Sequence, residues 1–206
     1  MMSSKNTPTR TKILQASLEL LEAGQGAEVR MSDIAKRAGI SRQALYLHFA
    51  TRTELLVETT LFVDDLKGAD KRLAPSRAAK TGIERLEAFV EAWGGYMPEI
   101  YGVGRPMMAM MDTDEEAAKA WNQRMWDVRE GCKAAIKALK ADQTLSPVYS
   151  VNQATDLLWT LLSVRSWEQL TQQCGWSQKK YIKSMKTLAH NTFVVAGTNL
   201  SQGKSK

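Results

Sequence analysis

The chain has 206 residues, of which 44% are hydrophobic and 24% are charged, and its formal net charge is +6. This composition predicts a soluble globular protein with an ordinary core, and the positive charge favours acidic partners such as nucleic acid or an anionic membrane without proving either. No stretch approaches 18 consecutive apolar residues, and residues 1–10 lack the apolar segment of a secretory signal. We therefore expect a cytoplasmic protein without membrane contact. The two cysteines, Cys132 and Cys174, are too few for a disulfide framework, and we expect both to be reduced and buried.

Apolar residues recur at helical spacing along most of the chain, and alternating apolar and polar runs are absent, which predicts an all-α fold. The N-terminal part contains four expected helices, at residues 10–24, 32–38, 41–49 and 52–66. Gly24 and Gly26 are expected to end the first helix. Ser32 and Ser41 are expected to cap the second and third helices.

Residues 69–80 contain Pro75 and mixed charges, and they are expected to form a linker. Beyond them, helices are expected at residues 81–97, 106–111, 113–140, 150–173 and 177–197. Thr113 opens the third of these with a capping-box sequence that ends at Glu116. The predicted domains are therefore 10–66, a small helical domain, and 80–197, a larger one.

Residues 32–49 have the spacing of a helix-turn-helix. Ala35 supplies the small residue where two short helices cross, and Gly39, four residues later, can adopt the positive φ of a sharp turn. Ile40 points the turn into the core, while Leu45 and Phe49 anchor the third helix from beneath. The outer faces of that helix are then available to enter the major groove of DNA.

The charge of this region agrees with a nucleic-acid partner. Residues 30–52 contain five basic residues and one acidic residue, so their net charge is 5 − 1 = +4. Phosphate groups are attracted to such a concentration of positive charge. A helical hairpin with a solvated basic face would also carry this charge, but it would not need small, glycine and apolar residues at these offsets.

The motif Ile34-Ala35, Ala38-Gly39-Ile40-Ser41, Leu45-Tyr46-Leu47-His48-Phe49, followed by Arg52 and Glu54-Leu55-Leu56, resembles the signature of TetR-type transcriptional regulators. The resemblance extends to Ser163–Leu170 and to Gly175-Trp176-Ser177, and it covers most of residues 10–196. It implies an N-terminal three-helix helix-turn-helix DNA-binding domain and a C-terminal helical domain for ligand binding and dimerisation. Two positions depart from the family: Arg52 replaces the usual lysine, and Arg30 replaces the usual threonine.

The resemblance implies that Arg42, Gln43 and Ala44 face bases, whereas Tyr46, His48 and Arg52 hold phosphates. The chemistry of the side chains agrees, because arginine can bond bidentately to guanine and glutamine to adenine. Tyr46 and His48 could each instead be packing residues, and Arg42 could be a solvated arginine. The candidate DNA-binding residues are Arg30, Ser32, Ser41, Arg42, Gln43, Ala44, Tyr46, His48 and Arg52.

The middle helices carry most of the methionine and tryptophan, side chains that adapt to ligands of varied shape. In TetR-type proteins the larger domain holds an effector pocket, so the resemblance implies a small, mostly apolar or aromatic effector. Taken singly, each of these residues is equally consistent with core packing. The candidate effector-binding residues are Trp93, Met97, Met107, Met111, Trp121, Met125, Trp126 and Trp159.

The last two expected helices carry wider apolar faces than one core needs. A two-fold homodimer through residues 150–173 and 177–196 would cover that surface. A fully buried helix pair within one chain is the alternative. The resemblance also implies a homodimer.

We interpret the chain as a ligand-responsive transcriptional repressor that binds a palindromic operator as a homodimer and is released by its effector. The sequence does not separate repression from activation. Motifs of zinc enzymes, phosphate-binding loops and serine hydrolases are absent, so we expect no enzymatic activity, cofactor or metal. Two alternatives are a helical ligand carrier, which would not need residues 30–52, and a non-specific DNA-binding protein, which would not need the methionine and tryptophan set.

Overall fold

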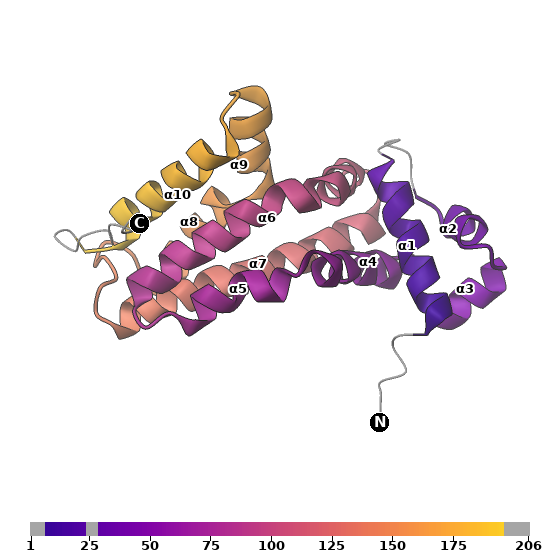
Figure 1. The fold of residues 1–206 in the computed structure, drawn as a ribbon, viewed down its shortest axis with the longest axis horizontal. Coiled ribbons are helices and arrows are strands. Elements are labelled where there is room, and N and C mark those ends of the chain that lie inside the picture. Colours follow the sequence, from indigo (N-terminus) through magenta and orange to yellow (C-terminus); the bar gives the residue numbers. More distant parts are fainter. Residues whose placement is uncertain (1–6, 24–28, 196–206) are drawn as a thin grey trace, which may run out of the picture. The chain divides into compact units, whose positions relative to one another are not determined.

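The computed structural model describes residues 7–23 and 29–195, and these residues form helices together with a single isolated β-bridge (Figure 1). The all-α prediction is confirmed. The chain divides into two compact units. The first comprises residues 1–68 and 99–125, and the second comprises residues 69–98 and 126–206.

The first unit contains the four N-terminal helices, α1 (Pro8–Glu22), α2 (Met31–Ala38), α3 (Arg42–His48) and α4 (Arg52–Lys67). The side chain of Thr7 caps α1 by accepting a hydrogen bond from the amide of Arg10, and Pro8 occupies the first turn, where its missing N–H costs nothing. Gly24 and Gly26, predicted to end α1, lie outside the described residues. The first helix accordingly begins two residues before its predicted start.

The caps of α2 and α3 differ in how well they were predicted. Ser41 caps α3 as expected, since its hydroxyl accepts from the amide of Ala44 at 3.1 Å. The prediction that Ser32 caps α2 is wrong, because the helix begins at Met31 and its N-cap, Arg30, makes no side-chain capping bond. Met31 is buried in the core of the unit, so its packing fixes where α2 begins.

Three predictions for the later helices are wrong. The expected linker is a helix, α5 (Ala69–Ala78), because Gly68 ends α4 in the left-handed conformation and the chain immediately resumes a helical path. The two helices expected at 81–97 and 106–111 are one, α6 (Gly82–Met110). The next helix, α7 (Glu115–Ala141), is capped by Asp114 rather than Thr113, because the carboxylate of Asp114 accepts from the amide of Ala117 at 3.1 Å.

The helix expected over 150–173 is interrupted. It consists of α8 (Val151–Leu161), α9 (Val164–Glu168) and a π-helical turn, η1 (Gln169–Gln173). The break occurs at Ser163, whose hydroxyl caps α9 by accepting from the amide of Ser166 at 3.1 Å. The last helix is α10 (Gln178–Phe193), which is capped by Ser177 as the prediction implied.

In the second unit, backbone hydrogen bonds join the segment that follows α7 to the end of α10. Leu145 and Val194 form the antiparallel bridge, and the amide of Ser146 donates to the carbonyl of Phe193 at 2.8 Å. Within this unit α8 and α10 lie in contact, as do α10 and η1. In the described residues no helix is both long and apolar enough to cross a membrane.

The two units do not coincide with the predicted domains 10–66 and 80–197. Both α6 and α7 are divided between the units, and residues 99–125 belong with the N-terminal helices. Side-chain bonds explain this assignment: the carboxylate of Asp64 on α4 pairs with Arg124 on α7. Thr53 on α4 also bonds to the carboxylate of Glu116 on α7.

The two cysteines occupy different environments. Cys132 on α7 is buried, and burial raises the pKa of its thiol to about 12. Cys174, which follows η1, is exposed, so the prediction that both are buried is wrong for this residue. It follows the last helical turn of η1 and precedes Gly175, which has a positive φ of 66°.

Candidate nucleic-acid interface

The crossing of α2 and α3 is built as the motif spacing predicted. Gly39 ends α2 with a φ of 68°, a left-handed conformation that favours glycine. Ala35, Leu45 and Phe49 belong to one buried core, against which Ile40 packs. Leu45 and Phe49 are completely buried, which fixes the rotation of α3 about its own axis.

That rotation leaves the opposite side of α3 open. Arg42, Gln43 and Tyr46 are exposed, and Ala44 and His48 are half-buried. The guanidinium of Arg42 donates to the hydroxyl of Tyr46 at 3.4 Å and also lies 5.6 Å from the centre of its ring. The pair is one helical turn apart, so each side chain restricts the rotamers of the other.

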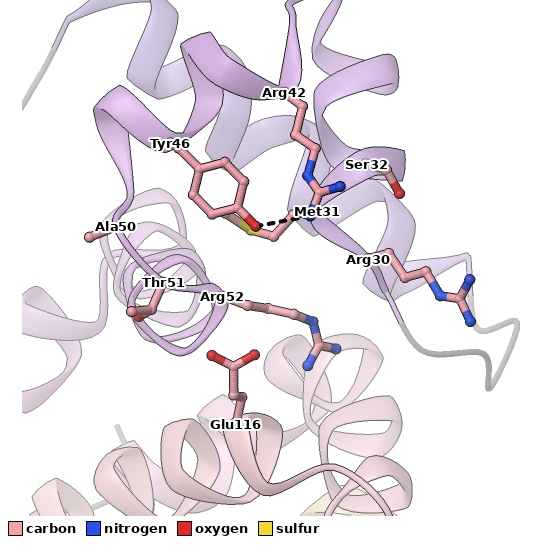
Figure 2. A pocket seen from close by; sticks show the side chains of 9 residues that line it. All are labelled: Arg30, Met31, Ser32, Arg42, Tyr46, Ala50, Thr51, Arg52 and Glu116. Atoms are coloured by element: carbon pink, nitrogen blue, oxygen red, sulfur yellow. Dashed lines mark hydrogen bonds between the residues drawn. The ribbon is translucent and has the colours of Figure 1, made fainter.

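A hollow of about 520 Å³ lies beside this face, and Figure 2 shows its lining. Residues from α2, α3 and the start of α4 surround it, together with one residue from α7. In Figure 2 the side chains of Arg42 and Tyr46 point toward each other on one side of the hollow, and Glu116 lies on the other. The lining residues are Arg30, Met31, Ser32, Arg42, Tyr46, Ala50, Thr51, Arg52 and Glu116.

The hollow therefore brings together five of the predicted DNA-binding residues. Its rim offers donors to an anion through Arg30, Ser32, Arg42 and Tyr46. The carboxylate of Glu116 opposes deep entry of a phosphate, since like charges repel. The geometry suits phosphate contact along the rim of the hollow.

Arg52 is placed differently from what the resemblance implies. Its side chain is only 8% exposed and its Nη1 pairs with the carboxylate of Asp114 at 2.5 Å. The Nε of Arg52 donates to the carbonyl of Val29 at 2.6 Å, and Nη2 lies 3.7 Å from the sulfur of Met110. The guanidinium thus joins the start of α4 to the turn before α7, and the phosphate contact of Arg52 stays a prediction.

The end of α3 is held by a residue that the sequence did not single out. Arg10 on α1 donates to the backbone carbonyl of His48 at 2.7 Å, and its guanidinium lies 4.0 Å from the centre of the Phe49 ring. It also pairs with the carboxylate of Glu58 on α4 at 3.3 Å. No local motif marks Arg10, because its partners are 38 to 48 positions away along the chain.

Two of the five basic residues within 30–52 are paired with carboxylates from outside this segment, so the net positive charge near the helix-turn-helix is lower than the sequence count of this segment suggests. Arg37 pairs with Glu19 on α1 at 2.5 Å, and Arg52 pairs with Asp114. Hydrogen bonding from Arg37 lowers the pKa of the Glu19 carboxyl. Arg30, Lys36 and Arg42 are exposed.

The candidate effector residues fall into both units. Met107, Met111, Trp121 and Met125 belong to the first unit, and Trp93, Met97, Trp126 and Trp159 to the second. Met97, Met107 and Trp121 are buried, whereas Trp126 is 54% exposed. Trp93 donates to the carbonyl of Leu162 at 2.8 Å, and Trp126 stacks edge-on against Trp159 with ring centres 6.4 Å apart.

Among the described residues, no cluster of three histidine, cysteine or acidic side chains is arranged to hold a metal.

Residues 13–59 match the model of the bacterial regulatory proteins of the tetR family. This segment contains α2, α3 and the start of α4, which is the helix-turn-helix described above. The N-terminal domain of the chain is of the TetR type. The resemblance predicted from its sequence is confirmed, as is the arrangement of an N-terminal helix-turn-helix followed by a helical C-terminal part.

The regulator is also similar to known proteins over most of its length. It is 26% identical to the nucleoid occlusion factor SlmA of Marinomonas sp. (strain MWYL1) over 78% of this chain and 82% of that protein. Its fold matches a putative TetR-family transcriptional regulator from Rhodococcus sp. with a TM-score of 0.70 and 18% identity, over 89% and 97% of the two chains. It also matches the transcriptional regulator FadR from Bacillus subtilis, solved in complex with stearoyl-CoA, with a TM-score of 0.69 and 12% identity, over 88% and 98%.

These similarities agree with a DNA-binding regulator. The prediction that the protein is not an enzyme is confirmed by the family, because TetR-type regulators are non-enzymatic. The exposed face of α3 is accordingly the candidate surface for contact with DNA.

Proposed function

We propose that this TetR-type regulator is a repressor that binds a palindromic operator as a homodimer and leaves it when a small, mostly apolar effector binds. The observation that carries the proposal is the face of α3 opposite the fully buried Leu45. That face presents Arg42 and Gln43, the side chains suited to guanine and adenine edges. Arg30, Ser32 and Tyr46, along the rim of the hollow, are suited to the phosphates beside it.

Arg42→Ala and Gln43→Ala are expected to relax sequence preference, each at a cost of about 1–3 kcal/mol in specific binding. Each change removes a side chain suited to bidentate hydrogen bonding with a base edge and leaves phosphate contacts in place. Tyr46→Phe should weaken binding to all sequences because a hydrogen bond to phosphate is lost, and it should also reduce part of the sequence preference because Arg42 loses its bond to the Tyr46 hydroxyl. Gel shifts with a selected duplex and a scrambled duplex measure both effects. Equal loss on both duplexes for Arg42→Ala would contradict its role in reading bases.

A homodimer is supported by the apolar residues that α8 and α10 leave exposed. Leu157 on α8 and Leu188 on α10 are each 45% exposed, within the predicted interface 150–173 and 177–196. A two-fold dimer would place one recognition helix on each half of a palindrome, with half-site centres about 34–36 Å apart or more. Sedimentation velocity at micromolar concentration should give a dimer. A monomer that keeps full operator affinity would overturn this part of the proposal.

An acyl or aromatic effector is supported by two observations. Methionine and tryptophan are concentrated on α6 and α7, and FadR, which shares this fold, was solved with stearoyl-CoA. Because the effector must bind the DNA-free form more tightly, operator DNA must weaken its binding by the same factor, about 5–150-fold for an ordinary coupling.

Tryptophan fluorescence tests the effector proposal. A panel of fatty acyl and aromatic compounds should include one that shifts the emission and lowers operator affinity. Met107→Leu, which keeps the volume of a buried side chain, should weaken that response, and so should Trp126→Phe, because both residues are candidate effector contacts. If no compound changed either the tryptophan emission or the operator affinity, the methionine and tryptophan residues would serve only as core packing.

The similarity to SlmA supports a second candidate, a nucleoid occlusion factor. Chromatin immunoprecipitation separates the two. A repressor should occupy a few sites beside genes whose transcripts rise when the regulator is deleted. A nucleoid occlusion factor should occupy sites along the chromosome without matching changes in transcripts.

A further inference from the structure

Leu47 on α3 is 87% exposed, more than any other large apolar side chain among residues 7–23 and 29–195. A single exposed leucine is common on protein surfaces and by itself indicates nothing. This one lies on a seven-residue helix whose remaining exposed side chains are polar, namely Arg42, Gln43 and Tyr46. Its position in the helix determines which side chains of α3 lie beside it.

Leu47 follows Gln43 by one helical turn, so the two side chains lie on the same face of α3. Arg42 and Tyr46 form the adjacent row, which is joined by their hydrogen bond. Leu45, completely buried, fixes the opposite side of the helix against the core. Any surface that Gln43 contacts is therefore within reach of Leu47.

The chemistry of the major groove limits what Leu47 can contact there. The base edges offer hydrogen-bond donors and acceptors, except for the 5-methyl group of thymine, which is apolar. A leucine side chain has no donor or acceptor, and water leaves both apolar groups when they meet. An aspartate, lysine or serine at this position would instead compete with Gln43 for polar base edges.

We propose that Leu47 is a specificity-determining residue that recognises the 5-methyl group of a thymine next to the base read by Gln43. This inference rests on the proposed operator binding through α3 and adds to it a preference for thymine that does not depend on hydrogen bonds. The contact desolvates about one methyl group, which corresponds to roughly a fourfold change in affinity per thymine.

The test uses a duplex selected by the full-length protein from a random pool, with single thymines replaced in turn by deoxyuridine. Deoxyuridine keeps every hydrogen-bonding group of thymine and removes only the methyl group. Wild-type protein should bind about fourfold more weakly when the contacted thymine is replaced. Leu47→Ala should bind the thymine duplex about fourfold more weakly and should not distinguish it from the deoxyuridine duplex.

Leu66→Ala is the matched control, because Leu66 is an exposed leucine of the same unit on α4, outside the helix-turn-helix. It should bind like wild type and remain sensitive to deoxyuridine. The inference is overturned if no deoxyuridine replacement weakens wild-type binding, or if Leu47→Ala keeps the same sensitivity. Failure of the protein to bind any selected duplex better than scrambled DNA would instead overturn the proposed operator binding itself.

Discussion

Replacing Arg52 with alanine is expected to lower the free energy of unfolding by about 3–5 kcal/mol. The change leaves Asp114, only 13% exposed, without the guanidinium that pairs with it. It also leaves the carbonyl of Val29 without its donor and removes the contact with Met110. Urea unfolding monitored by circular dichroism measures the loss.

Two variants complete this experiment. Asp114→Asn removes the charge but keeps a side-chain oxygen to cap α7, so it should lose stability because Arg52 loses its counter-ion. Arg37→Ala breaks a pair whose side chains are 58% and 37% exposed, and it should leave the unfolding midpoint almost unchanged. A midpoint for Arg52→Ala equal to that of Arg37→Ala would mean that the pair contributes no stability.

DNA binding separates the two roles considered for Arg52. If its guanidinium held a phosphate, Arg52→Ala would reduce the dependence of log affinity on log salt concentration by about one unit of slope. Because the guanidinium is used by Asp114 and Val29, we expect the slope to remain unchanged in Arg52→Ala and in Asp114→Asn. A reduced slope in Arg52→Ala but not in Asp114→Asn would show that Arg52 contacts a phosphate.

Gly82→Ala is expected to lower the free energy of unfolding by about 1–3 kcal/mol, toward the upper end of that range. A Cβ on Gly82 would lie 2.5 Å from the backbone nitrogen of Leu139 and 2.6 Å from the carbonyl carbon of Ala138. Backbone atoms at the end of α7 cannot rotate away as a side chain could. The amide of Gly82 also donates to the carboxylate of Asp142, which holds the start of α6 in place.

Gly95→Ala is the matched control, because it lies in the same helix and a Cβ there would meet nothing within 4 Å. Neither glycine has a positive φ, so backbone conformation does not distinguish them. Gly95→Ala should raise the free energy of unfolding by about 0.5–1 kcal/mol, since alanine favours a helix interior more than glycine does. Thermal or urea unfolding should therefore move the two variants in opposite directions, and movement in the same direction would contradict the assigned contact at Gly82.

The helix-turn-helix was predictable because its constraints are local. Ala35, Gly39, Leu45 and Phe49 each occupy a position dictated by two short helices and one turn, all within 15 residues. The break at Ser163 had a local signal too, since serine is among the residues preferred at a helix N-cap. The apolar pattern continues across Ser163, however, and therefore predicts one uninterrupted helix.

Features that depend on distant residues were not predictable in the same way. Pro98 and Pro106 suggested a break, but α6 continues through both, and Val103 and Met107 between and beyond them are buried. Packing of this kind can offset the hydrogen bond that each proline removes. Likewise, nothing near Arg52 indicated Asp114, which lies 62 residues away, so the family pattern implied a phosphate where the structure has a carboxylate.

The contrast between the two thiols makes the wild-type protein suited to site-specific labelling. Maleimide reagents attack the thiolate, and the buried Cys132, with its pKa raised to about 12, provides almost none at neutral pH. Cys174 is exposed and is the only other cysteine in the chain, so each subunit should accept one spin label without mutagenesis. In a two-fold assembly, the distance between the two spin labels could be measured with and without operator or effector. A change in that distance would report a rearrangement of the two subunits.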